Sequence, residues 1–472
     1  MRRAMLIDGT GAPLRGPVDI FIDGNRIDRI LPSGSTMANV PIGEGEPPAT
    51  SGREMDLDGF YVLPGLMDLY APVSEPIEYG LELWLAHGIT TIREPFCSEG
   101  IEACLRLKEA SSRNERLAPR IFPYLALGLD ADTSSQSLLE TRDRVAEAAQ
   151  AGASGVDLRF SKPTVLRAAL EEALRQEIGA SVQLDENSGS RLHALDVARW
   201  GGGFLESWHG LPEALLPKGS RPAFSAGYDP RLPKARSRAA VAVWNQAGRP
   251  GTERWLEVID ALVEQDLTLI PALSSLESRR DLMRARRADW HDAYTLPSLW
   301  RAFGIDQAEP WSTEDEVAWR GLFSTWMAFL NDFKDRGGRV VTGSGAGRSF
   351  NLYGFGLVRE LELLQEAGFE PMEALLSATS LSAEALGMGS QLGTVESGKL
   401  ADLIIVKGNP LVDFKILYGA TPDSSARAGK KGRGRASEEG IRWTVKDGIL
   451  YEVPKLLAGV RQRVGEARER SR

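Results

Sequence analysis

The side chains in this sequence that could do chemistry are a set of carboxylates and a few imidazoles. The 472 residues include four histidines, His87, His193, His209 and His291. Carboxylates stand where short apolar runs end, at Asp68, Glu94, Asp157, Asp185 and Glu186. Brought together with one imidazole, such carboxylates could hold Mg²⁺, Mn²⁺ or Ca²⁺ through oxygen ligands. We favour a structural interpretation, in which these groups are held by hydrogen bonds, helix starts and Arg93 or Arg159.

Eight short apolar runs, separated by amphipathic segments, are the elements that must position these side chains. The runs are residues 61–68, 89–94, 120–126, 155–160, 181–185, 203–209, 268–273 and 338–344. The segments between them have apolar residues at helical spacing, as in TVLRAALEEALRQEIG. Eight strands alternating with helices predict an α/β protein with a closed, TIM-like (β/α)8 barrel over residues 64–392. The C-terminal ends of the strands would form one mouth, where such barrels bind ligands.

A long insertion interrupts this pattern between the seventh and eighth strands, at residues 274–337. It includes five tryptophans, Trp290, Trp300, Trp311, Trp319 and Trp326. A loop that follows a barrel strand lies at the mouth, so we expect this insertion to shape any ligand site.

Both ends of the chain have the alternating pattern of β-strands. A Gly turn at residues 23–25 joins two such runs and predicts a hairpin. We expect residues 1–63 and 393–455 to form one composite β-sandwich domain. Residues 424–440 are rich in Gly, Ser, Lys and Arg without periodicity, which predicts a flexible basic surface loop. Residues 456–472 are expected to form a charged, fraying helical tail.

Composition and charge disfavour several classes of function. The formal net charge of −9 provides no positive field for nucleic acid or an anionic membrane. Cys97 and Cys104 lack the CxxC spacing of a zinc or redox site, so we expect two reduced thiols. The N-terminus has no apolar signal region, and no run reaches the ~18 apolar residues that span a bilayer. We therefore expect a cytoplasmic protein whose partners include neither nucleic acid nor a membrane.

Several motifs occur in a characteristic order along almost the whole chain. LIDGTG, YVLPGLMD and HGITTIRE come first, and VVTGSGAG and GTVESGKLADLIIVKGNPL follow near the C-terminus. In this order they resemble the amidohydrolase superfamily, in particular its imidazolonepropionase- and prolidase-like members. The resemblance implies one or two divalent metals at the barrel mouth. The family holds them through His-x-His after the first strand, often a carboxylated lysine on the fourth, histidines after the fifth and sixth, and an aspartate after the eighth.

Most of the positions that would hold this metal are substituted here. Tyr70 and Pro72 stand where the resemblance implies His-x-His, and a proline side chain has no lone pair to offer. Asp157 stands at the lysine position, with Arg159 on the same strand face, and we expect a structural ion pair. Gly345 replaces the aspartate within an otherwise matching motif.

The positions after the fifth and sixth strands differ from each other. The fifth-strand position falls on Leu184 or, with a shift of one residue, on Asp185. His209 alone matches the family, at the end of the sixth strand. His87 ends a helix, where an imidazole can interact with free carbonyls. We place His193 within the helix after the fifth strand and His291 in the Trp-rich insertion, and expect both to be surface or packing residues.

These substitutions predict an amidohydrolase-like protein that has lost metal-dependent hydrolysis. It would bind a small molecule at the barrel mouth, or act as a regulatory or structural subunit in a homo-oligomer or a complex with an active relative. No cofactor is then expected. The alternative is an active hydrolase of C–N bonds in cyclic amides or peptides, with His209, Asp157 and Asp185 as candidate catalytic residues. A divalent metal is expected only under that alternative.

Overall fold

The computed structural model describes most of the chain. The described residues are 1–35, 53–97, 99–128, 137–160, 162–184, 192–224, 228–229, 232–305, 312–419 and 439–471. No helix in these ranges is long and apolar enough to cross a membrane. Asp185, Glu186, Trp311 and most of the predicted loop at residues 424–440 lie outside them.

The centre of the molecule is a parallel sheet of eight strands that follow one another in chain order. They are β5 (Leu66–Asp68), β6 (Ile89–Glu94), β7 (Arg120–Leu127), β8 (Gly155–Leu158), β9 (Gly179–Val182), β10 (Phe204–Glu206), β11 (Thr268–Ile270) and β12 (Arg339–Val340). The sheet curls so that its two ends meet. Leu69 N donates to Thr342 O at 2.9 Å, and the Thr342 hydroxyl donates to Met67 O at 2.8 Å. The predicted TIM-like barrel is confirmed.

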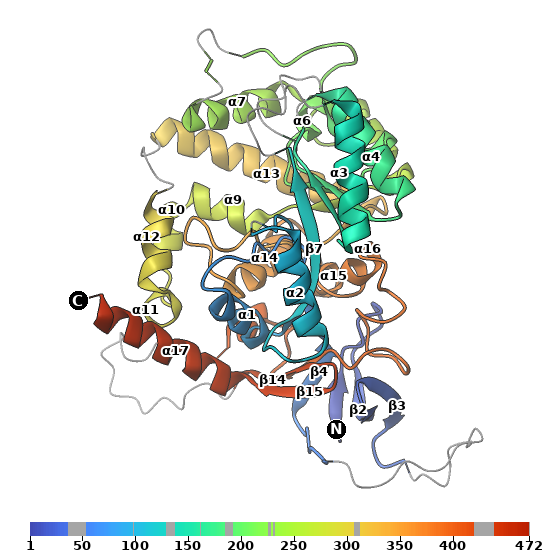
Figure 1. The fold of residues 1–472 in the computed structure, drawn as a ribbon, viewed down its shortest axis with the longest axis vertical. Helices are drawn as coiled ribbons and strands as arrows, with labels where there is room; N and C mark the ends of the chain where they lie inside the picture. Colours follow the sequence, from blue (N-terminus) through green and yellow to red (C-terminus); the bar gives the residue numbers. More distant parts are fainter. Residues whose placement is uncertain are drawn as a thin grey trace.

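Helices cover the outside of the barrel. Those in the first half are α1 (Ile77–Ala86), α2 (Ile101–Ser112), α3 (Leu138–Ala151), α4 (Pro163–Arg175), α5 (Ala194–Arg199), α6 (Leu211–Ala214), α7 (Pro233–Gln246) and α8 (Glu253–Glu264). Those in the second half are α9 (Leu273–Arg280), α10 (Leu282–Arg286), α11 (His291–Tyr294), α12 (Pro297–Ile305), α13 (Thr313–Asp335), α14 (Phe355–Glu366), α15 (Pro371–Ser377) and α16 (Ser380–Ala385), with a 3₁₀ turn at Phe414–Tyr418. Figure 1 shows α3 and α4 side by side on the barrel, and α7 beside α13.

The predicted first strand, residues 61–68, is two strands in two different sheets. β4 (Phe60–Pro64) belongs to the sheet formed by the chain ends, and only β5 enters the barrel. The break falls at Gly65, where a Cβ would lie 2.2 Å from the Thr90 hydroxyl. Close packing at this crossing therefore requires glycine.

The chain ends form a second sheet, as expected. Its strands lie in the order β15 (Ile449–Glu452), β14 (Gly440–Lys446), β13 (Leu403–Lys407), β4, β1 (Ala4–Leu6), β2 (Arg15–Asp23) and β3 (Arg26–Pro32). The predicted hairpin is β2–β3, with Gly24 at φ 56° in its turn. The seven strands form one continuous sheet, whereas a sandwich of two sheets was expected. Ile27 N donates to Lys399 O at 2.9 Å, so the hairpin end returns to the segment before β13.

The C-terminal tail is a docked helix, α17 (Val453–Arg470), where a fraying tail was expected. Leu457, Val460 and Val464 are buried on one of its faces, and the helix packs against α1 (Figure 1). An ion pair between Arg463 and Glu82 of α1 accompanies this packing. The apolar stripe on the helix therefore outweighs its charged composition.

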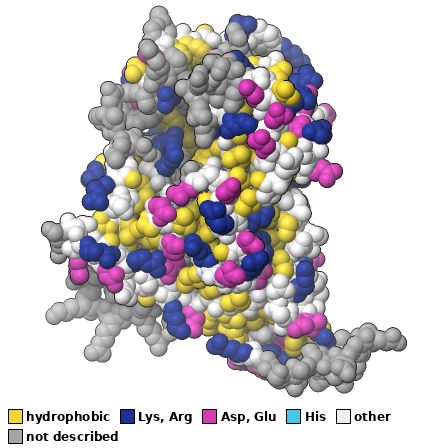
Figure 2. All heavy atoms as spheres, in the orientation of Figure 1, with side chains coloured by type: hydrophobic (Ala, Val, Ile, Leu, Met, Phe, Trp, Pro, Cys, Tyr) yellow, Lys and Arg dark blue, Asp and Glu magenta, His cyan; other side chains and the backbone are white. Residues whose placement is uncertain are grey.

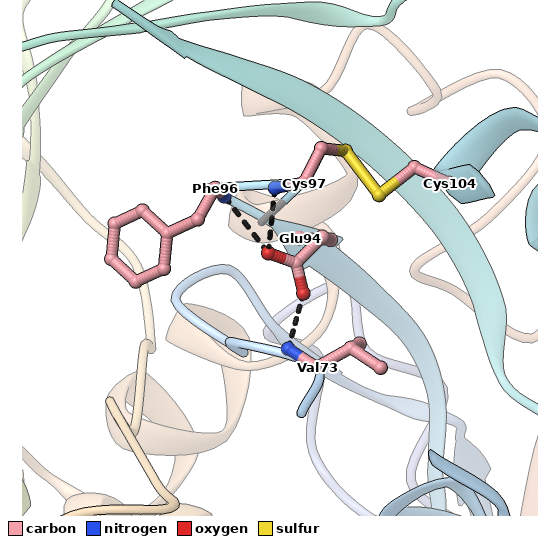
Figure 3. The surroundings of a disulfide bond; sticks show 5 residues. All are labelled: Val73, Glu94, Phe96, Cys97 and Cys104. Atoms are coloured by element: carbon pink, nitrogen blue, oxygen red, sulfur yellow. Dashed lines mark hydrogen bonds between the residues drawn. A yellow bond between two sulfur atoms is a disulfide. The ribbon is translucent and has the colours of Figure 1, made fainter. Parts of the chain in front are cut away.

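The prediction of two reduced thiols is wrong, because Cys97 and Cys104 form a disulfide (Figure 3). Cys97 lies in the loop after β6, and Cys104 lies at the start of α2, so the helix brings the two Cα atoms within 5.7 Å. That separation suits a disulfide.

Charges of both signs are mixed on the described part of the face shown in Figure 2. On the face shown in Figure 2, acidic and basic side chains are interspersed among hydrophobic ones. The described part of this face therefore presents no extended basic field, in keeping with the net charge of −9.

Candidate functional site

Two arginines and two acids meet inside the barrel, and we call Arg93, Asp157, Arg159 and Glu206 the ion-pair cluster. They come from β6, from β8 with the residue just beyond it, and from β10. Arg93 Nη2 donates to Glu206 Oε1. Arg159 Nε donates to Asp157 Oδ1 at 2.7 Å, and its Nη2 lies 3.8 Å from Glu206 Oε2. The predicted Asp157–Arg159 ion pair is confirmed and extended by a second pair.

The cluster is largely buried and lined by aromatic rings. Arg93 has an exposed fraction of 0%, and its guanidinium carbon lies 4.8 Å from the centre of the Tyr124 ring. Arg159, nearer the mouth, lies 4.5 Å from the centre of the Phe96 ring. Such cation–π contacts stabilise a guanidinium that has lost its water.

The two carboxyl groups of the cluster titrate in opposite directions. Burial, together with the charge of Glu206, raises the pKa of Asp157 despite its arginine neighbours. Burial opposes ionisation of Glu206 as well, but Arg93 and Arg159 outweigh it and lower its pKa. Asp157 Oδ2 and Glu206 Oε2 are buried oxygens without a described hydrogen-bond partner, so a proton on Asp157 could be donated to Glu206. These opposite shifts favour a single proton on the pair, carried by Asp157.

Tyr70 and Gly345, two of the substituted positions, are packed against each other. Gly345 N donates to Tyr70 O at 2.7 Å, and a Cβ on Gly345 would lie 3.0 Å from the Tyr70 ring. Gly345 also has φ 57°, a left-handed conformation that glycine adopts easily. The tyrosine ring therefore stands where a side chain at position 345 would need space.

The other substituted positions offer no metal ligand. Pro72 is half-buried in the loop after β5, and Leu184 is buried against Gly210. Asp185 falls outside the described residues. Within the described ranges, no three or more His, Cys, Asp or Glu side chains are grouped so that they could hold a metal ion. The residues present at the described positions therefore do not fit the ion that the resemblance implies.

Asp68 and Glu94 have the structural role that we favoured. Asp68 accepts hydrogen bonds from the Ser344 amide at 2.8 Å and the Ser344 hydroxyl at 2.5 Å, and burial raises its pKa to about 6. Glu94 accepts from the amides of Phe96 at 2.8 Å and Cys97 at 3.1 Å, and from that of Val73. Burial raises the pKa of Glu94 to about 7.

Three histidines have structural roles. His87 Nδ1 lies 2.7 Å from Leu83 O at the end of α1, as expected, and burial lowers its pKa to about 4. His291 contacts the Thr295 hydroxyl at 2.7 Å. His193 is the N-cap of α5, whereas we had placed it within the helix.

His209 lies just beyond β10, half-buried at the barrel mouth. Its ring lies edge-on to that of Trp208, with centroids 5.8 Å apart. Trp208 in turn packs against Trp319 of α13, in the predicted insertion, at 5.1 Å. The insertion thus supports the segment that carries His209.

Glu206 and Ser181 were not among the residues predicted for the site. The Ser181 hydroxyl donates to Glu206 Oε1 at 2.5 Å. A signal for Glu206 was present. Glu206 follows Phe204 at a spacing of two, so both side chains lie on one face of the strand. A carboxylate on a buried strand face requires a partner, and Arg93 had been considered only as a partner for other acids.

Comparisons with known proteins agree with this architecture. Residues 320–431 match the model of the Amidohydrolase family, and no curated protein matches the chain. A Xaa-Pro dipeptidase with bound methionine is 19% identical, with a TM-score of 0.63 over 96% of this chain and 98% of that chain. Bottromycin amidohydrolase is 18% identical, with a TM-score of 0.66 over 99% of this chain and 90% of that chain. Ochratoxinase of A. niger is 14% identical, with a TM-score of 0.59 over 96% of this chain and 95% of that chain. At these identities the structures show the fold alone; with the family match, they confirm that this chain resembles the amidohydrolases.

Proposed function

We propose that this protein is an amidohydrolase-like pseudoenzyme, whose barrel mouth binds a small molecule without metal-dependent hydrolysis. It would serve as a regulatory or structural subunit, in a homo-oligomer or with an active relative. The observation that carries the proposal is the ion-pair cluster, which places two guanidinium groups inside the barrel.

The charge of the cluster argues against a divalent cation beside it. Arg93 and Arg159 already neutralise the carboxylate of Glu206, and Asp157 favours its protonated form. A divalent ion would have to displace Arg159 from Asp157 and would then face two buried positive charges. Repulsion between like charges is strong where water is excluded. The cluster therefore supplies the positive charge that a metal would otherwise bring.

Metal analysis of the purified protein tests the proposal. The protein is incubated with Zn²⁺, Mn²⁺ or Fe²⁺, freed of unbound ion, and assayed for metal per chain and for hydrolysis of Xaa-Pro dipeptides and cyclic amides. We expect much less than one ion per chain and no metal-dependent hydrolysis. One tightly bound ion per chain whose removal abolishes hydrolysis would overturn the proposal.

A second function, hydrolysis of C–N bonds at an atypical site, is favoured by one observation. Asp157 on β8 is a carboxyl group poised to hold a proton, and His209 lies just beyond β10, two strands away in the same sheet. An acid and an imidazole are the groups used in general acid–base catalysis. The neighbours described as dipeptidase and amidohydrolase suggest peptides or cyclic amides as substrates.

Two substitutions separate this second function from the first. If His209 is catalytic, His209→Ala abolishes hydrolysis, whereas His193→Ala, which changes a partly exposed histidine at the N-cap of α5, leaves it intact. Asp157→Asn should also abolish activity, because an amide cannot transfer the proton. If neither the parent protein nor any variant hydrolyses these substrates, the second function is excluded for them.

A further inference from the structure

The loop between β6 and α2 connects the disulfide to the ion-pair cluster. Phe96 lies over the Arg159 guanidinium at 4.5 Å, and its ring stands edge-on to Tyr70, with centroids 6.0 Å apart. The next residue, Cys97, is bonded to Cys104 of α2. In Figure 3, the Phe96 ring and the disulfide point to opposite sides of this loop. The Phe96 ring that covers the cluster and the disulfide that reduction can break therefore belong to consecutive residues.

Two anchors hold this loop in place. Glu94 accepts hydrogen bonds from the amides of Phe96 and Cys97, as Figure 3 shows. The disulfide is the second anchor, and it closes a short ring of chain through the first turns of α2. Cys97 has φ 41°, a left-handed conformation that a residue other than glycine keeps only where its surroundings hold it.

We propose that Cys97–Cys104 is a thiol–disulfide exchange site for a dithiol reductant, and that its reduction uncovers Arg159. Cys97 is 4% exposed, whereas Cys104 is only half-buried, so exchange begins at Cys104. A thiolate of the reductant attacks the Cys104 sulfur, the bond between the two protein sulfurs breaks, and Cys97 leaves and takes up a proton. The second thiol of the reductant then displaces Cys104 as a thiol. The protein disulfide gains two electrons and two protons, and the dithiol becomes a disulfide.

Reduction removes one of the two anchors of the loop that places Phe96 over the cluster. With the disulfide open, the two hydrogen bonds to Glu94 hold the left-handed Cys97 without covalent support. The loop gains conformational freedom, and the Phe96 ring spends less time over Arg159. Arg159 has one buried nitrogen, Nη2, without a described hydrogen-bond partner, so uncovering Arg159 would bring a guanidinium donor into contact with solvent. This inference holds whether or not the protein hydrolyses a substrate.

Dithiothreitol treatment of the folded protein tests the proposal with three readouts. Thiol titration should rise from none to two per chain. Amide hydrogen exchange of residues 94–104 should become about tenfold faster, while α17 stays unchanged. Phenylglyoxal, which modifies guanidinium groups, should label Arg159 severalfold faster, while labelling of the exposed Arg167 serves as a constant reference.

Two variants serve as controls. Cys97→Ser/Cys104→Ser should show fast exchange and labelling that dithiothreitol does not alter. Phe96→Ala with the disulfide intact should label at Arg159 as fast as the reduced parent protein. The proposal is overturned if the untreated protein already has two free thiols, if the thiols appear only on unfolding, or if reduction leaves Arg159 labelling unchanged. Because the parent protein is compared in two redox states, the test stands even if the double variant does not fold.

Discussion

Glu206 accepts hydrogen bonds from Arg93 and from Ser181, so its carboxylate joins strands β6, β9 and β10 inside the barrel. Arg93 has no water to replace this partner, because its exposed fraction is 0%. At the scale of single residues, we expect the balance between these two charges to contribute to the stability of the barrel.

Glu206→Gln removes that balance while keeping the shape of the side chain. A buried guanidinium left without its carboxylate should lower the free energy of unfolding by about 3–5 kcal/mol. Urea denaturation followed by circular dichroism measures this loss. As a control, Glu171→Gln breaks an exposed pair with Arg142 and should cost about 0–1 kcal/mol. Equal costs for the two variants would contradict the role given to Glu206.

The contact between Tyr70 and Gly345 predicts that a side chain at position 345 destabilises the fold. Gly345→Asp forces a Cβ to within 3.0 Å of the Tyr70 ring, so we expect a loss of about 1–3 kcal/mol. In a Tyr70→Ala background, the ring is gone and the same substitution should cost clearly less. A double-mutant cycle of unfolding free energies measures the difference. If the cost is the same in both backgrounds, the ring does not restrict position 345.

The substitutions at Tyr70 and Gly345 could be identified from the sequence, because matching motif residues flank each of them. Their contact was not readable, since Tyr70 and Gly345 lie far apart in the chain and meet only when the barrel closes. The same limit applies to Glu206, whose partner Arg93 lies 113 residues away. The residue types thus indicated which metal ligands are missing. The contacts that occupy the barrel interior could be identified only from the closed barrel.

At the scale of elements, apolar patterns predicted the barrel well and sheet membership less well. β6 was predicted with its observed bounds, because a turn precedes it and the loop to α2 follows it. The run at residues 61–68 has one continuous apolar pattern, and only the packing at Gly65 divides it between two sheets. The stripe along α17 was present in the sequence at helical spacing, but its charged residues suggested a free tail.

The docking of α17 can be tested by comparing two leucines. Leu457 is 1% exposed on the packed face of α17, so Leu457→Ala should lower the free energy of unfolding by about 2–5 kcal/mol. Leu174, on α4, is 68% exposed, so Leu174→Ala should stay within about 0.5 kcal/mol of the parent protein. Thermal and urea unfolding measure both changes. A neutral Leu457→Ala would mean that α17 contributes little to the fold.

At the scale of the whole molecule, the buried acids set how stability depends on pH. Burial raises the pKa of Asp68 to about 6, of Glu94 to about 7 and of Glu360 to about 8. Each acid binds its proton more tightly in the folded chain than in the unfolded one, so its contribution to stability is lost as the pH rises through the folded pKa. His87 acts in the opposite direction, because burial lowers its pKa to about 4, but this effect ends near the ordinary histidine pKa of about 6.5.

Above about pH 6.5, Glu94, Asp157 and Glu360 release their protons, so the free energy of unfolding should fall as the pH rises to about 8.5; the N-terminal amine, whose pKa burial lowers, offsets part of this fall. The slope is at most about 1.4 kcal/mol per pH unit for each proton released. Glu360 should contribute most near the upper end of this range, because its carboxylate is fully buried and has no described arginine or lysine partner to favour its charged form, although it accepts hydrogen bonds from the amides of Leu273 at 2.8 Å and Ser274 at 2.6 Å. Glu360→Gln keeps an acceptor oxygen but cannot titrate, so urea denaturation at several pH values should give a shallower slope for this variant. Glu171→Gln, which changes an exposed acid, should keep the slope of the parent protein. A stability that rises between these pH values, or a slope that Glu360→Gln does not change, would show that these acids are not protonated in the folded barrel.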